Sequence, residues 1–102
     1  MDLVVGVYEL LGNLPSYEKF ALADQIRRVA VSVPANIAEG QKRNSKKEFI
    51  QFCSISRGSL GEVETHLEIM SRVHGVDVER LLKECDTIGR MLNGLVKSMK
   101  VS

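Results

Sequence analysis

Apolar residues recur at intervals of three and four through almost the whole chain of 102 residues. This spacing marks one face of an α-helix, and it is clearest toward the C-terminus. The apolar positions there are Val78, Leu81, Leu82, Cys85, Ile88, Leu92, Leu95, Val96 and Met99. No segment alternates apolar and polar residues as a half-buried strand would. The sequence therefore predicts an all-α protein.

Three earlier segments, residues 2–11, 17–39 and 45–74, show the same spacing. Their apolar faces consist of Leu3, Val4, Val7, Leu10 and Leu11, then Ile26, Ala30, Val33 and Ile37, then Phe49, Phe52, Leu60, Val63, Leu67 and Met70. Four amphipathic helices with short connections bury their faces against one another. We expect a single domain, residues 1–102, folded as an antiparallel up-and-down four-helix bundle.

The second predicted helix contains a proline, Pro34, and reaches a glycine, Gly40. Proline removes a backbone donor and clashes with the preceding turn, but the apolar spacing continues past Pro34 in phase. We therefore expect a kinked second helix, and we expect Gly40 to end it in the left-handed conformation.

The other predicted helix ends follow known capping patterns. Ser16 and Ser45 are suited to N-caps, and Glu48 completes a capping box with Ser45. Gly75 is expected to close the third helix and Asp77 to cap the fourth. Gly58 and Gly61 fall inside the third helix, where each costs about 1 kcal/mol relative to alanine. We expect another backbone to approach closely there.

Several kinds of function lack their sequence signals. The chain has no Gly-rich phosphate loop, no catalytic nucleophile beside a base and no set of metal ligands at a recognised spacing. Cys53 and Cys85 lie on apolar faces and are interpreted as small buried residues. No signal peptide and no apolar run of about 20 residues is present. We expect a cytoplasmic protein with no membrane association, no cofactor and no enzymatic activity.

Basic residues gather in one stretch although the net charge is only +1. Lys42, Arg43, Lys46 and Lys47 flank the junction of the second and third helices, and Arg27 and Arg28 precede them. Such a set can bind phosphates, and the start of the third helix adds backbone N–H groups. The alternative is a solvated loop, since no aromatic residues lie between the basic residues for base stacking.

A band of polar residues follows the apolar face of the second helix. It comprises Gln25, Arg28, Ser32, Asn36 and Glu39, and Arg57, Ser59 and Glu62 of the third helix are possible partners. We expect Asn36 and Glu39 to be at least partly buried and hydrogen-bonded to a neighbouring helix or subunit. The alternative is simple exposure of Gln25, Asn36, Glu39, Arg57 and Glu62.

Five segments resemble the four-helix bundle family of ribosomal RNA intervening-sequence proteins. They are Gln25–Arg28, Ser32–Gly40 (SVPANIAEG), Ser45–Phe49, Arg57–Thr65 and Met91–Met99. The likeness extends from Val7 almost to the C-terminus. Family members carry one to two further helical turns before the position of Val7, so the first helix is short here.

The resemblance implies a bacterial bundle whose molecular role is mostly unassigned and for which no enzymatic activity is known. It also implies a relation to the accessory protein of diversity-generating retroelements, a homopentamer that binds nucleic acid and a reverse transcriptase. We therefore expect a homo-oligomer, a ring of five identical subunits, that binds RNA or DNA through its basic surface. The alternative is a protein-interaction scaffold, for example an accessory subunit of a reverse transcriptase, without affinity for nucleic acid.

Overall fold

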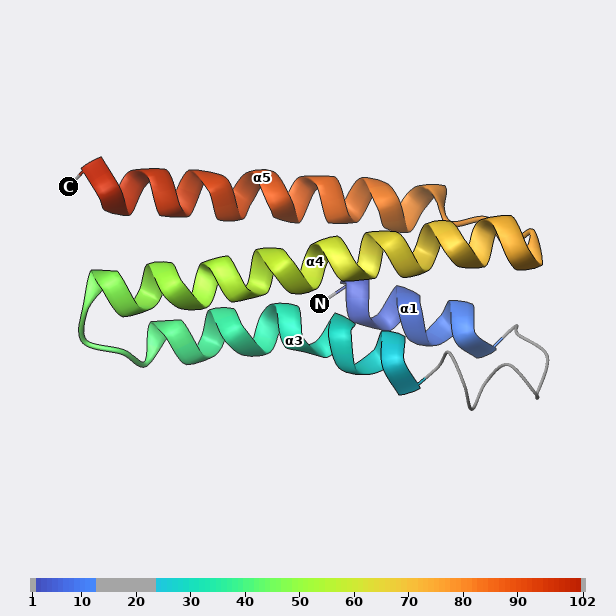
Figure 1. Cartoon of the computed structure of the whole chain (residues 1–102), viewed down its shortest axis with the longest axis horizontal. Helices are drawn as coiled ribbons and strands as arrows, with labels where there is room; N and C mark the ends of the chain where they lie inside the picture. Colours follow the sequence, from blue (N-terminus) through green and yellow to red (C-terminus); the bar gives the residue numbers. More distant parts are fainter. Residues whose placement is uncertain (1, 13–23, 102) are drawn as a thin grey trace.

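The computed structural model describes residues 2–12 and 24–101, which form four α-helices and, within these ranges, no strand. The helices are α1 (Asp2–Gly12), α3 (Asp24–Gln41), α4 (Lys46–His74) and α5 (Glu79–Val101). Figure 1 shows that each of them runs opposite to the one before it. The prediction of an all-α four-helix bundle is confirmed. The predicted cap Ser16 and the expected helical residues 17–23 lie outside the described ranges.

The core is built from the predicted apolar faces. Its largest cluster includes Leu3, Val7 and Leu11 of α1, Ile26, Ala30 and Val33 of α3, Leu60, Val63, Leu67 and Met70 of α4, and Val78, Leu81 and Cys85 of α5. A second cluster joins Phe49, Cys53 and Leu92. Both cysteines are buried and free, as predicted.

The first helix covers only one half of the bundle. It has 11 residues against 29 in α4, and it contacts α3 and α5 but not α4. Figure 1 shows α1 beside the half of the bundle that contains the start of α5. The prediction that Leu95 belongs to the core was wrong: it is 37% exposed, because no part of α1 reaches over that turn of α5.

Most of the predicted helix ends are confirmed. The Ser45 side chain accepts a hydrogen bond from the Glu48 N–H at 3.1 Å and caps α4. Gly75 ends α4 in the left-handed conformation with φ 66°. The Asp77 carboxylate accepts from the Glu79 N–H at 3.1 Å, at the first turn of α5.

Gly40 does not end α3 as predicted. The helix continues to Gln41, and Gly75 is the glycine with positive φ among the described residues. Gly40 is buried against α4, where a Cβ would lie 2.9 Å from Cβ of Phe52. A glycine is required here by close packing. Pro34 lies inside the same helix, whose kink stays a prediction.

The expectation for Gly58 and Gly61 is not met by the residues that the structure describes. Among them, a Cβ added at either position would have no neighbour within 4 Å, apart from its own helix. Both glycines are exposed on the outer side of α4.

Candidate nucleic-acid interface

The four basic residues at the α3–α4 connection are all exposed. Two backbone hydrogen bonds tighten this connection, from Lys42 N–H to the Glu39 carbonyl and from Arg43 N–H to the Gly40 carbonyl. The Ser45 cap then starts α4 at once, so the four residues stay on one end of the bundle. N–H groups in the first turn of a helix lack partners within the helix and favour anions.

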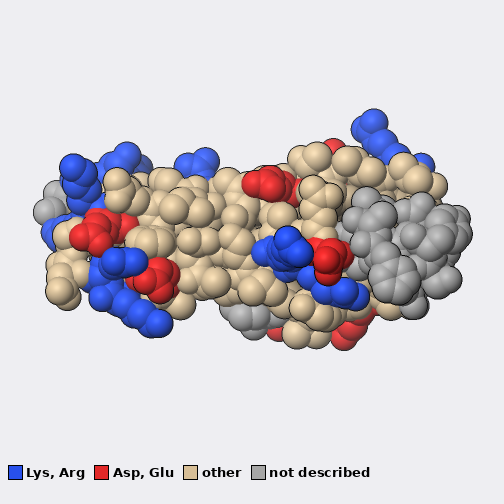
Figure 2. All heavy atoms as spheres, turned by 60° about the horizontal axis from the view of Figure 1, so that its bottom comes forward, with Lys and Arg blue, Asp and Glu red and all other residues tan. Residues whose placement is uncertain are grey.

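Two further lysines join this end from α5. Met99 packs against the core cluster of Phe49 and Leu92, and it lines a hollow of about 400 Å³ together with Arg43 and Lys46. Lys97 and Lys100 flank Met99 and are exposed. Figure 2 shows blue atoms gathered at the left end, where Figure 1 places the α3–α4 connection and the end of α5. We call Lys42, Arg43, Lys46, Lys47, Lys97 and Lys100 the basic end.

Neither Lys97 nor Lys100 was predicted as part of the site. Two sequence signals would have found them. In an up-and-down bundle the last turn of the fourth helix returns to the junction of the second and third. The chain also contains no acidic residue after Asp86, although it contains Arg90, Lys97 and Lys100.

Arg43 is engaged by residues at the end of α3 and in the first turns of α4. Its guanidinium lies 2.8 Å from Glu39 Oε1 and 3.8 Å from Glu48 Oε2. It also stacks over the Phe52 ring at 5.0 Å. Arg43 therefore ties the end of α3 to the start of α4, and Lys42, Lys47, Lys97 and Lys100 add exposed positive charge at the same end.

The structure does not bring Arg27 and Arg28 to the basic end. Arg28 precedes Lys42 by 14 residues of nearly continuous helix, which is about 21 Å. Arg27 lies over the Tyr8 ring of α1 at 5.3 Å. Arg28 pairs with Asp24 at 3.5 Å on the exposed side of α3.

In the predicted polar band Ser32 makes the side-chain contact to α4. The expected hydrogen bonds of Asn36 and Glu39 to a neighbouring helix are not found among the described residues, because both bond partners four residues away along the chain. Asn36 is half-buried and donates to the Ser32 carbonyl at 2.8 Å and to Ser32 Oγ at 2.9 Å. Ser32 Oγ in turn lies 2.7 Å from Ser59 Oγ of α4. Glu39 is half-buried and accepts a hydrogen bond from Arg43, four residues further along the chain. Gln25, Arg57 and Glu62 are exposed.

The sequence did not predict one buried polar contact at this interface. Ser56 lies fully buried on the apolar face of α4, and its hydroxyl donates to the Val33 carbonyl at 2.7 Å. This bond and the Ser32–Ser59 contact fix how far α3 and α4 are shifted along each other.

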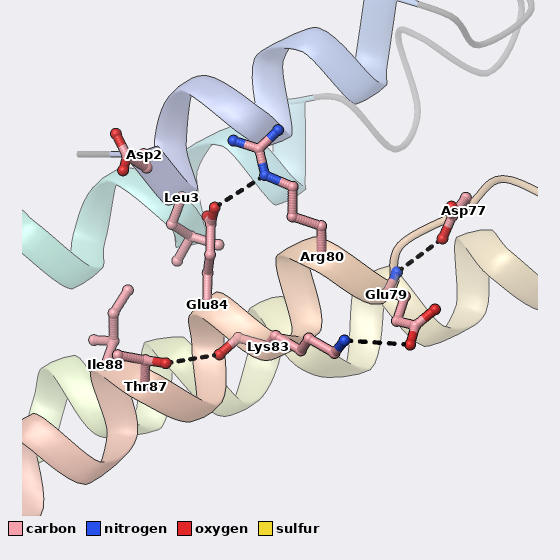
Figure 3. A pocket seen from close by; sticks show the side chains of 9 residues that line it. All are labelled: Asp2, Leu3, Asp77, Glu79, Arg80, Lys83, Glu84, Thr87 and Ile88. Carbon is pink, nitrogen blue, oxygen red and sulfur yellow. Dashed lines mark hydrogen bonds and ion pairs between the residues drawn. The ribbon is translucent and has the colours of Figure 1, made fainter.

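A hollow of about 670 Å³ lies between the start of α1 and the first turns of α5 (Figure 3). Leu3 and Ile88 form apolar walls. The charged residues pair with one another, Arg80 with Glu84 at 3.4 Å and Lys83 with Glu79 at 3.5 Å. The hollow shows no nucleophile beside a base.

The described residues offer no group of three or more side chains suited to a metal ion. Burial raises the pKa of both thiols, that of Cys85 to about 12 with help from Glu64 and Glu84, so neither is a ready nucleophile. Among the described helices, none is long and apolar enough to cross a membrane.

Comparison with known proteins gives the family of this chain. The family model described as 23S rRNA-intervening sequence protein matches residues 1–94. A search of curated proteins found no match. The matched range contains the α3–α4 connection and most of α5, and its helices are those of the bundle above. The chain therefore belongs to the 23S rRNA-intervening sequence protein family.

Proposed function

We propose that this chain is a non-enzymatic bundle that associates with copies of itself and binds RNA or DNA through the basic end. The observation that supports this most is the convergence of lysines from two places in the sequence, Lys42, Lys46 and Lys47 with Lys97 and Lys100. Lysines attract phosphates without reading bases, so the predicted binding is sensitive to salt and tolerant of sequence.

The uneven charge of the molecule also favours this function. The molecule is 48 Å long, and its basic end carries two acidic residues, Glu39 and Glu48, both in contact with Arg43. The acids of the other half include Asp2, Asp77, Glu79, Glu84 and Asp86. A nucleic acid would therefore approach one end of the bundle. The family, moreover, is named for an intervening sequence of 23S rRNA.

Self-association would strengthen weak binding at each copy. A ring repeats the basic end around its axis, and a nucleic acid that reaches several copies gains affinity by multivalency. This part of the proposal also explains why the chain leaves apolar residues such as Ile55, Ile69 and Tyr8 exposed.

The test measures binding of a structured RNA and of a DNA duplex as a function of salt. Replacing Lys42, Lys97 and Lys100 with alanine should reduce affinity at low salt by at least about tenfold and flatten the salt dependence. The matched control replaces Arg72, Arg80 and Lys83 with alanine. It removes the same charge from the other end of the bundle, and its affinity should stay within about threefold of wild type.

Equal losses in both variants would overturn the assignment to the basic end. No binding by the intact protein at low salt would overturn the nucleic-acid function itself. The protein-interaction scaffold, for example for a reverse transcriptase, would then take its place.

A further inference from the structure

The outer side of α4 carries apolar and small residues where a solvated helix would carry charges. We call Ile55, Gly58, Gly61, Glu62, Thr65 and Ile69 the glycine face. Ile55 is 51% and Ile69 46% exposed, and neither glycine has a neighbour that a Cβ would meet. Each glycine weakens the helix by about 1 kcal/mol relative to alanine, and nothing in the described chain requires that cost. A second subunit whose surface approaches α4 closely would explain why these two positions lack side chains.

A second apolar surface lies on α1 and α3. We call Val5, Tyr8, Arg28 and Val31 the tyrosine face. Tyr8 is 49% and Val31 42% exposed, and they line one shallow hollow together with Arg28. Because α1 contacts α3 and α5 but not α4, the glycine face and α1 lie on different sides of the bundle.

The two faces lie at the same height along the bundle. Ser32 and Ser59 meet at 2.7 Å, and Val31 and Gly58 are their neighbours in sequence. One turn farther along, Arg28 and Glu62 differ in height by only about 1.5 Å. Tyr8 lines one hollow with Arg28, Val31 and Ser32, which places it at this height too.

The charges on the two faces are complementary. Glu62 lies in the middle of the glycine face, and its carboxylate has no ion pair among the described residues. A two-fold contact between two glycine faces that matched Ile55 with Ile69 would place Glu62 against Glu62. Like charges at that position are unfavourable. The hollow of the tyrosine face carries Arg27 and Arg28 against Asp24, which pairs with Arg28 at 3.5 Å in an exposed and therefore weak ion pair, so this face keeps a net positive charge for Glu62.

We propose that the glycine face of one copy packs on the tyrosine face of the next, with Tyr8 and Val31 seated over Gly58 and Gly61 and Arg28 paired with Glu62. Each copy offers one of each face, and because the faces lie at equal height, successive copies are related by a rotation without a shift along the bundle. Such contacts close into a ring when the rotation divides a full turn. This inference deepens the self-association in the proposed function, and its test requires no nucleic acid.

Crosslinking through introduced cysteines tests which faces meet. Val31→Cys and Gly58→Cys are made separately and together, and each protein is treated with a short bismaleimide. Cys53 and Cys85 are buried, so wild-type protein treated with the same reagent gives the background of crosslinking. The double variant should give a ladder of crosslinked subunits that ends at one limiting size. Each single variant should give no crosslinked dimer.

Two results would overturn the proposal. Efficient crosslinking of either single variant would indicate a two-fold contact. Absence of a ladder from the folded double variant would exclude these faces, whatever the mass of the wild-type protein.

Sedimentation supplies the second measurement, with a matched pair of glycine variants. Gly58→Gln should shift the wild-type oligomer to the 11.4 kDa monomer at micromolar concentration. Gly94→Gln, at an equally open position on α5, should leave the mass unchanged. Equal masses for the two variants would contradict the proposal. The Lys42, Lys97 and Lys100 variant should keep the wild-type mass, so a failure of nucleic-acid binding and a failure of this interface are distinguishable.

Discussion

The hydroxyl oxygens of Ser32 and Ser59 lie 2.7 Å apart between α3 and α4, 27 residues apart in sequence. Asn36 donates to the same Ser32 hydroxyl, and the Ser56 hydroxyl donates to the Val33 carbonyl one residue farther along α3. The Ser32–Ser59 and Ser56–Val33 contacts cross an otherwise apolar interface, where a shift of one helix along the other would leave their polar groups unpaired. They therefore set the alignment of α3 with α4, on which both the basic end and the proposed subunit contact depend.

Asn36→Ala should lower the free energy of unfolding by about 1 kcal/mol, because it removes the donor to Ser32 from a half-buried position. Urea unfolding measures this loss. Gln25→Ala, at an exposed position of the same helix, is the control and should stay within about 0.5 kcal/mol of wild type. Equal values for the two variants would show that the Asn36 hydrogen bonds contribute nothing net.

Gly40→Ala should destabilise the fold by about 1–3 kcal/mol although alanine is the better helix former. The new Cβ would lie 2.9 Å from Cβ of Phe52 and 3.2 Å from Cδ1 of Phe49, so α3 and α4 would have to separate. Gly94→Ala has open space and should stabilise the fold by up to about 1 kcal/mol. Thermal unfolding of both variants should show melting temperatures that move in opposite directions.

Arg43→Ala should affect stability more than binding, unlike the lysine variants of the basic end. It removes ion pairs with Glu39 and Glu48, which are partly exposed and weak, and the stacking on Phe52. Together these are expected to contribute about 1 kcal/mol. Affinity for RNA should fall by less than in the Lys42, Lys97 and Lys100 variant. A larger loss of affinity with unchanged stability would place Arg43 among the residues that contact phosphate.

Alkaline pH should destabilise the protein through Cys85. Burial raises the pKa of this thiol from its ordinary 9.0 to about 12, with smaller contributions from Glu64 and Glu84. Between these values the unfolded chain releases a proton that the folded protein retains, so the free energy of unfolding falls as pH rises above 9. The stability of wild type relative to Cys85→Ala should therefore decrease by about 1 kcal/mol between pH 8 and 10. A constant difference in urea unfolding would contradict the assigned burial of the thiol.

Charge reversal should test the proposed pair of Arg28 and Glu62. Arg28→Glu and Glu62→Arg each place like charges in the contact and should weaken the oligomer. The double variant restores opposite charges and should recover most of the wild-type association in sedimentation. Loss of association in the double variant equal to the sum of the two single losses would show that the residues do not meet.

The sequence determined the elements of this fold with little ambiguity. Helical spacing predicted the apolar faces, such as that of Ile26, Ala30 and Val33, and local chemistry predicted the Ser45 cap and the Gly75 stop. Apolar faces and helix caps depend on residues within one or two turns of each other, so they can be predicted from the local sequence. The four basic residues of the α3–α4 connection were predicted as a cluster for the same reason.

Contacts between residues that are far apart in sequence were decided by the tertiary structure. Gly40 looked like a helix stop but fits against Phe52, and Leu95 looked like core but has no helix over it. Arg43 looked like its lysine neighbours but is engaged by Glu39 and Phe52. The basic end includes Lys97 and Lys100 because α5 returns there, which the order of helices in the bundle could indicate but no local pattern could. Each outcome depends on which helix packs beside which residue, and that is fixed by the whole core rather than by any local pattern.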